Sequence, residues 1–213
     1  MSDSVRTNGV EVSVVNGPSG NIGDATNYTE IKTDGEINLH GTARVYKKKI
    51  IPVQDLSVGG TAPDQAILGN VLGYSYDIND DSVFSTELPN DWCSGTDVVI
   101  SCDWYINEAY AAANGEVRWQ AAWSALPHDS TEAVDAPTHS GSDNSGDINI
   151  PATAKYLTET AVETIPAASL SAGDEIGITF KRVALGDGAN PTADPVVVNI
   201  YLKYTSDRLG EAL

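Results

Sequence analysis

The fold is decided by residues 81–126, DSVFSTELPNDWCSGTDVVISCDWYINEAYAAANGEVRWQAAWSAL, which contain all four tryptophans of the chain. Two runs in this stretch alternate strictly, one through Val98, Ile100, Cys102, Trp104 and Ile106, the other through Val117, Trp119, Ala121 and Trp123. Period-2 alternation is typical of strands with one buried and one wet face. A large aromatic side chain removes about 150–250 Å² from water, so Trp104, Trp119 and Trp123 are predicted to lie in the core. Because Asn114-Gly115 is a hairpin signal, we expect the two runs to pair as antiparallel neighbours.

Strand-like runs recur on both sides of this stretch. We expect strands at residues 36–46, 67–78, 82–88, from 95, from 115, 155–165, 175–184 and 196–204. Phe180, in the run 175–184, is predicted to join the core. No amphipathic helix separates the runs, so the sequence predicts an all-β chain folded as an eight-stranded β-sandwich of the jelly-roll type. An immunoglobulin-like sandwich is the alternative, but its Cys…Trp…Cys arrangement is missing.

The first 34 residues are different in character. They contain a short alternating piece, Val10, Val12 and Val14, followed by a segment rich in Gly, Asn, Ser and Asp. We interpret residues 1–34 as an extended N-terminal arm and residues 35–213 as one jelly-roll domain. An arm that lies across a neighbouring subunit and a partly disordered tail both fit this composition. A second polar segment, residues 128–150, is predicted to be a long exposed loop.

Charge is the strongest compositional signal. With 12 basic and 30 acidic residues the chain carries a formal charge of −18, which repels nucleic-acid backbones. An acidic surface of this kind suits high salt, where self-repulsion is screened, so a halophilic source and an ordinary acidic protein both remain open. No stretch approaches the roughly 20 apolar residues of a membrane span, and the N-terminus lacks a secretion signal. Cys93 and Cys102 alone do not make a disulfide framework.

The sequence nominates no catalytic group. It contains no G-x-S-x-G, no G-x-x-x-x-G-K-[ST], no H-E-x-x-H and no Cys-x-x-Cys. Carboxylates gather at Asp77/Asp80/Asp81, at Asp143/Asp147 and at Asp187/Asp194. Residues 77–81 have the alternate oxygens of a calcium loop, but Ser82 occupies the glycine position and no glutamate follows at the right distance. His128 and His139, with Asp129, could hold a metal only if the fold brought them together. We therefore predict no enzyme, no metal and no cofactor.

Several tyrosines occupy positions opposite or adjacent to the expected core phase. They are Tyr74, Tyr76, Tyr105, Tyr110 and Tyr201. Amphipathic tyrosines suit subunit interfaces and sugar stacking equally well. Together with Val10, Val12 and Val14, all of them except Tyr110 are the predicted interface residues.

One part of the sequence resembles a known group of proteins. Leu88, Pro89, Asp91 and Trp92 form a turn, Gly95-Thr96-Asp97 opens the next strand, and Trp104 and Val117-Arg118-Trp119 follow. This order is similar to that of structural proteins of tailed viruses of bacteria and archaea. The resemblance covers about 40 residues closely. It implies a jelly-roll component of the capsid exterior or of fibres, often trimeric, made in the host cytoplasm and located in the virion.

Two functional hypotheses follow. The first is a non-enzymatic virion structural protein (a capsid, decoration or turret component) whose partners are copies of itself, most simply a trimer, and other capsid proteins. The second is a carbohydrate- or receptor-binding β-sandwich module that recognises a host-surface glycan. Neither hypothesis involves nucleic acid or a membrane.

Overall fold

The computed structural model describes residues 3–7, 10–14, 19–23, 26–32, 36–42, 44–109, 115–128, 132–186 and 189–209. Within these ranges the regular structure is β-strand, with two single turns of 3-10 helix, η1 (Val53–Asp55) and η2 (Ala167–Ser169). Over the same ranges, no helix has the length and apolar content needed to cross a bilayer.

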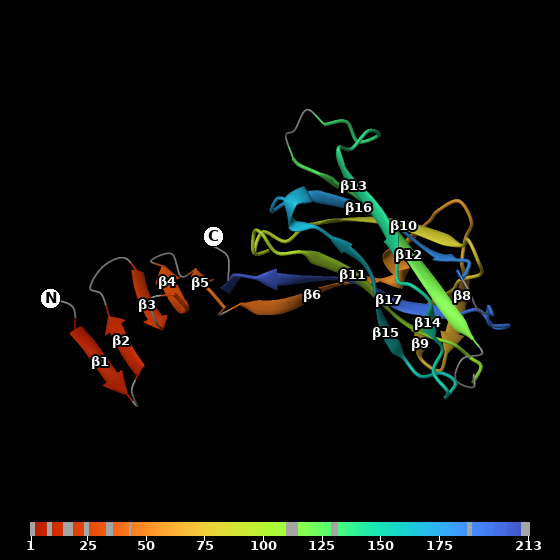
Figure 1. Cartoon of the computed structure of the whole chain (residues 1–213), viewed down its shortest axis with the longest axis horizontal. Coiled ribbons are helices and arrows are strands. Elements are labelled where there is room, and N and C mark those ends of the chain that lie inside the picture. Colours follow the sequence, from red (N-terminus) through yellow and green to blue (C-terminus); the bar gives the residue numbers. More distant parts are fainter. Residues whose placement is uncertain are drawn as a thin grey trace.

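Two antiparallel sheets face each other and enclose the core (Figure 1). The first sheet contains β6 (Val45–Pro52), β8 (Asp64–Leu68), β9 (Val71–Ser75), β11 (Val98–Tyr105), β15 (Thr158–Ile165) and β17 (Val196–Ser206). The second contains β7 (Ser57–Val58), β10 (Asp81–Glu87), β12 (Glu116–Leu126), β13 (His139–Asn144), β14 (Ile148–Asn149) and β16 (Glu175–Val183).

The strand order defines a jelly roll. Along the chain the eight main strands are β6, β10, β11, β12, β13, β15, β16 and β17. In space they are ordered β6-β17-β11-β15 in the first sheet and β10-β16-β12-β13 in the second, and every neighbouring pair is antiparallel. A chain that alternates in this way between two four-stranded sheets is the double Greek key of the jelly roll. The fold class expected from the sequence is confirmed.

The pairing expected for the two tryptophan runs is wrong. β11 lies in the first sheet and β12 in the second, so the runs face each other across the core instead of pairing side by side. The rings of Trp104 and Trp119 approach across this gap, with centroids 6.0 Å apart. Alternation reports which face of a strand is buried, but it carries no information about which strand lies beside it.

Aromatic rings fill the space between the sheets. Trp119 stacks on Phe180 with centroids 5.2 Å apart, and Tyr76 meets both rings edge-on at 5.7 Å. Trp104 donates a hydrogen bond from Nε1 to Thr160 Oγ1 at 2.9 Å, which satisfies its one buried polar atom. Trp123 and Cys102 are buried too.

The polar segment 128–150 contributes β13 and β14 instead of a continuous loop. β13 pairs with β12 from Gln120, which lies opposite Asn144, to Ala125, which lies opposite His139. Its side chains are largely exposed, so it forms the edge of the second sheet through its backbone. An edge strand that buries little has no apolar alternation, and the sequence therefore predicts a loop there.

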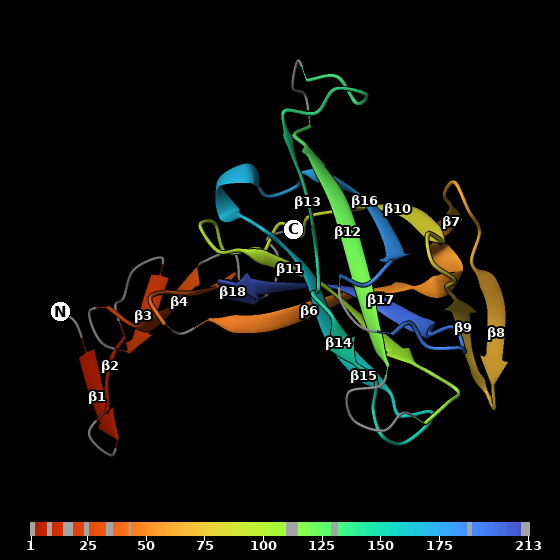
Figure 2. The same ribbon diagram turned by 45° about the vertical axis from the view of Figure 1, so that its right-hand side comes forward.

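A third sheet stands beside the sandwich as a single layer (Figures 1 and 2). We call it the N-terminal sheet. Its strands, in spatial order, are β1 (Asp3–Thr7), β2 (Val10–Val14), β3 (Ser19–Gly23), β4 (Tyr28–Lys32), β5 (Ile37–Leu39) and β18 (Arg208–Leu209).

The expected boundary at residue 34 does not coincide with the end of this sheet. β5 lies beyond that boundary, and β18 comes from the other end of the chain. The segment expected as an extended arm is a meander of paired strands. A lone strand is marginal in water, whereas successive hairpins satisfy one another's backbone hydrogen bonds.

Replacing Trp119 with alanine should lower the free energy of unfolding by about 3–5 kcal/mol, because the cavity would lie among three aromatic rings. Denaturant titration followed by far-UV circular dichroism measures the change. Tyr46, which is 89% exposed, provides the matched control, and Tyr46→Ala should change the value by no more than about 0.5 kcal/mol. Similar losses in both variants would contradict the assignment of Trp119 to the core.

Candidate interaction surface

The N-terminal sheet has one apolar face. Residues directly opposite one another share a face of a sheet, and successive residues of a strand alternate between faces. The register therefore places Ile22, Ile31, Ile37, Leu39 and Leu209 on a single face. We call this set the apolar face.

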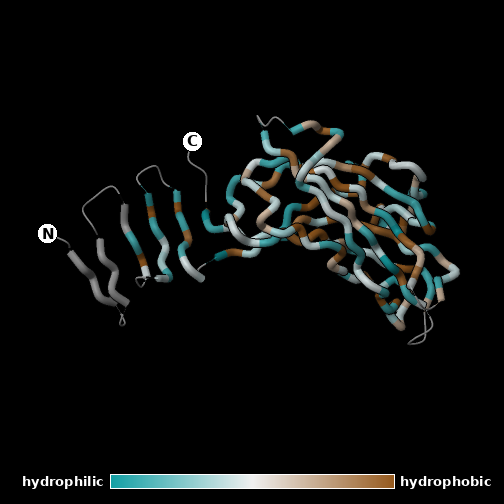
Figure 3. Tube along the Cα trace, turned by 45° about the horizontal axis from the view of Figure 1, so that its top comes forward, coloured by the Kyte–Doolittle hydropathy of each residue, from teal (hydrophilic) through white to brown (hydrophobic). Residues whose placement is uncertain are grey.

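This face is not covered by the chain's own sandwich. Ile22 and Ile31 are each 43% exposed, and Leu209 is 41% exposed. Ile37 and Leu39 are half-buried, and none of these five residues belongs to the sandwich core. In Figure 3 the coloured strands of the N-terminal sheet, which include β4, stand clear of the sandwich.

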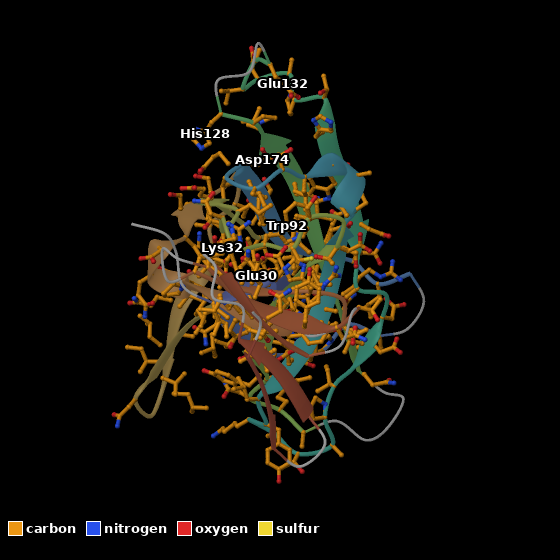
Figure 4. All side chains as sticks on the ribbon, turned by 90° about the vertical axis from the view of Figure 1, so that its left-hand side faces the viewer. Glu30, Lys32, Trp92, His128, Glu132 and Asp174 are labelled. Carbon is orange, nitrogen blue, oxygen red and sulfur yellow. The ribbon has the colours of Figure 1, made fainter. Side chains whose placement is uncertain are left out.

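The opposite face of the same sheet is polar and ordered by paired side chains. Tyr28 stacks on His40 with ring centroids 4.2 Å apart, and Glu30 lies 3.2 Å from His40 Nε2. Lys32 contacts Glu36 at 2.6 Å; Figure 4 shows Glu30 and Lys32 on the sheet that faces the viewer. Glu36 also lies 3.3 Å from Arg208, and this ion pair links β18 to the residue that immediately precedes β5. The sheet is thus amphipathic, with a solvated face and a bare apolar one.

The turn at residues 88–92 anchors this sheet to the sandwich. Trp92 is buried, and its Nε1 donates to the carbonyl of Thr96 at 3.0 Å. Asp91 accepts hydrogen bonds from Ser206 Oγ at 2.9 Å and from Tyr204 at 3.2 Å, and it also accepts one from Lys47. Ser206 immediately precedes the short link to β18. The turn therefore fixes the point where β17 leaves the sandwich and enters the N-terminal sheet.

The groups around Asp91 lower the pKa of its carboxyl. Burial raises the pKa of the carboxyl, but hydrogen bonds from Lys47 and Ser206 outweigh burial and hold the pKa below its ordinary value of 3.8. A carboxylate with a lowered folded-state pKa stabilises the fold above its unfolded pKa, and that contribution is lost as the pH falls through the folded pKa. Asp91 is consequently a structural carboxylate.

The predicted outward tyrosines do not form an exposed surface. Tyr76 is fully buried, and burial raises its pKa. Tyr105 is buried as well, and Tyr74 is half-buried against the core. Tyr110 lies outside the described residues. The outward placement expected for Tyr76 is wrong because this residue follows the end of β9, where the chain turns inward and its hydroxyl meets Ser82 Oγ at 2.8 Å.

Tyr201 does lie on the outer face of the first sheet, but other side chains cover it. Its hydroxyl donates to Asp103, and the Lys48 ammonium lies 5.0 Å from its ring centroid. Burial, and then the hydrogen bond with Asp103, raises the pKa of Tyr201 to about 12. Lys48 and Lys203 both contact Glu159, so the lysine that lies over the Tyr201 ring is held in place by an ion pair.

The predicted interface valines have a different status. Val10, Val12 and Val14 lie on β2, and their side chains lie outside what the structure describes. Sequence analysis missed Ile22, Ile31 and Leu209. Their strands have two to five residues, too short for an alternation to be recognised.

The carboxylate loops bind their own backbone. Asp80 accepts from the Asp77 amide at 2.7 Å, and Asp81 accepts from the Thr61 amide at 2.8 Å. Burial, followed by the charges of Asp77, Asp194 and Asp64, raises the pKa of Asp80.

Two further carboxylates pair with arginines. Asp147 contacts Arg118 at 2.6 Å, and Asp194 contacts the buried Arg182 at 2.7 Å. Asp187 lies outside the described residues.

The histidines do not lie close to one another. His40 lies on the N-terminal sheet, whereas His139 lies on β13, 3.7 Å from Glu132. Figure 4 shows His128 and Glu132 at one end of the sandwich. Among the residues that the structure describes, no group of three or more His, Cys, Asp or Glu side chains is arranged to hold a metal ion.

Shallow hollows mark both outer faces of the sandwich. One of about 550 Å³ lies on the second sheet, over Ala122, Ser124, Gly177 and Thr179, with Val83 and Pro137 at its rim. A smaller one, of about 320 Å³, lies on the first sheet beside Tyr46, Asp97 and Lys203. Neither encloses a ligand-sized cavity lined by convergent polar groups, as binding clefts usually are.

Comparison with known proteins yields only distant likenesses. No family model matches the chain, and no curated protein matches it. Among solved structures, the carbohydrate-binding module CBM36 in complex with calcium and xylotriose has 17% identity and a TM-score of 0.40; the match covers 72% of this chain and 98% of that one. The infectious bursal disease virus Gt strain structure has 12% identity and a TM-score of 0.37, covering 93% of this chain and 41% of that one.

Asp91→Asn should lower the free energy of unfolding by about 1–3 kcal/mol at neutral pH, because the partly buried hydrogen bonds from Lys47, Tyr204 and Ser206 lose their charged acceptor. The difference from the parent should be complete above about pH 4 and should shrink below it, since the Asp91 pKa is lowered. Denaturant titrations from pH 2.5 to pH 7 measure both effects. Asp55→Asn, at an exposed position, is the control, and an equal loss there would remove the special role of Asp91.

Proposed function

We propose that the chain is a non-enzymatic structural protein of a virion: a capsid-associated jelly roll that assembles with copies of itself and with other capsid proteins. The observation that carries this proposal is the amphipathic N-terminal sheet, whose apolar face the chain leaves exposed beside a sandwich that already has a complete core. Contiguous exposed apolar surface of this kind marks sites of protein contact. The resemblance of the Leu88–Trp119 segment to viral structural proteins supports the same role.

The architecture suits a shell component. Jelly rolls serve as capsid domains, and the sandwich here leaves the N-terminal sheet free to reach a neighbour while Asp91 holds its base. The acidic surface, with net charge −18, keeps the copies apart except where apolar contact outweighs repulsion. The trimer that the resemblance implies is one possible assembly, and a shell, decoration or turret position is compatible with the same surface.

Particles purified on a density gradient from producing cells provide the direct test. The chain should sediment with them in a fixed ratio to the major shell protein. Deleting residues 2–34, which removes β1–β4, should abolish this co-sedimentation and leave the tryptophan fluorescence of the sandwich unchanged, because all four tryptophans lie in residues 92–123. An intact chain that never sediments with particles would contradict the proposal.

A second candidate function, glycan binding, is favoured by one residue. Tyr46 is 89% exposed on β6, beside a hollow that contains Asp97, Lys203 and Thr205. An exposed aromatic ring flanked by polar groups suits stacking on a sugar.

A glycan array tests this alternative. If the chain is a glycan-binding module, it should bind a defined set of glycans, and Tyr46→Ala should weaken that binding at least about 10-fold without altering the melting temperature. Tyr156, which is 63% exposed on a different loop, serves as the control through Tyr156→Ala. No binding on the array, combined with co-sedimentation, would leave the virion role alone.

A further inference from the structure

We propose that the apolar face of the N-terminal sheet is covered by the same face of a second copy of the chain, so that two six-stranded sheets pack face to face. The inference rests on the proposed function, since assembly requires self-association, and it names the surface and the partner.

The first argument is the missing layer. A β-sheet with one apolar face is stable when that face packs against another layer. Ile22, Ile31 and Leu209 each keep about two-fifths of their surface exposed, while the opposite face is occupied by the ordered pairs of Glu30 and Glu36. The unfilled side is therefore the face that carries Ile22, Ile31 and Leu209.

The second argument is charge. Two copies that each carry a charge of −18 repel one another over most of their surface. Among the strand residues whose side chains the structure describes, register assigns Ile22, Thr29, Ile31, Ile37, Leu39 and Leu209 to the apolar face, and none of them is charged. Contact through this face leaves the acidic side chains outside the contact.

The third argument is area. Six strands spaced about 4.8 Å apart span about 24 Å, and five residues rise about 17 Å. Because β5 and β18 have only three and two residues, the resulting flat area of about 400 Å² per copy is an upper bound. Side-chain relief increases the accessible area, and a face-to-face pair therefore approaches the total of about 1,000 Å² at which specific association begins. One flat face is the natural complement of another, and a twofold axis makes the two contributions identical.

The same geometry disfavours a threefold arrangement. Packed sheets lie about 10 Å apart, so each contributes about 5 Å to the shared layer. Three sheets about 24 Å wide, arranged as the sides of a triangular prism, would each lie about 7 Å from the threefold axis. Side chains that reach about 5 Å would leave the centre of the prism unfilled. The pairing therefore predicts a twofold contact in place of the trimer expected from the sequence.

Lysine substitutions on opposite faces of one strand separate this contact from general effects of charge. Ile22→Lys and Ile31→Lys place a charge in the apolar face, whereas Asn21→Lys adds the same charge on the polar face of β3. Light scattering and sedimentation equilibrium of the full chain should show a dimer for the parent and for Asn21→Lys. The dissociation constant should rise at least about 100-fold in each isoleucine variant, because each change occurs twice in the interface.

Salt and fluorescence complete the experiment. Raising the ionic strength from about 0.1 M to 1 M should tighten the parent dimer, because repulsion is screened while apolar burial is retained. An unchanged tryptophan emission spectrum and an unchanged melting temperature would show that the sandwich of each variant is intact. A monomeric or trimeric parent, or equal weakening by Asn21→Lys, would overturn the pairing.

The two proposals fail in different ways. A monomeric chain that still sediments with particles would overturn the pairing and leave the virion role standing. A chain that forms the predicted dimer but never joins particles would keep the pairing and overturn the virion role.

Discussion

The contact of aromatic rings across the two sheets is the interaction on which the rest of the structure depends. Trp119 on β12 touches Trp104 from the opposite sheet, Phe180 from the neighbouring strand, and Tyr76 at the end of β9. These four rings lie at the centre of the sandwich core, and each is fully buried. Because a packed interior transmits small changes in volume, this cluster sets how the sheets approach and therefore where their edges and loops lie.

The edge of this core determines how the N-terminal sheet is presented. β17 is central in the first sheet, where it pairs with β6, β9 and β11, and its chain continues through Asp207 into β18. Asp91 binds Ser206 at the point of exit, and Arg208 meets Glu36 just beyond it. The N-terminal sheet is thus joined to the most buried part of the fold by one continuous strand and a set of charged hydrogen bonds.

The surface of the sandwich leaves few other places for function. Lys48 lies over the Tyr201 ring and pairs with Glu159, and Lys47 is held by Asp91, so both lysines have partners within the chain. The acidic loops cap backbone amides or pair with arginine. Against this background, an apolar face that no part of the described chain covers is the feature that most requires a partner.

Local alternation along the chain, clearest in residues 98–123, was enough to determine the all-β class, the burial of the tryptophans and the approximate position of several strands, because a strand in a two-layer fold must put every second residue inside. The partner of each strand was decided only by the tertiary structure: β11 and β12 share the same pattern yet lie in different sheets. The buried tyrosines and the exposed isoleucines of the N-terminal sheet were likewise beyond the sequence. Burial depends on which segments pack against a residue, and these segments can be distant in the chain. Ile37 and Leu209, for example, lie side by side in the N-terminal sheet.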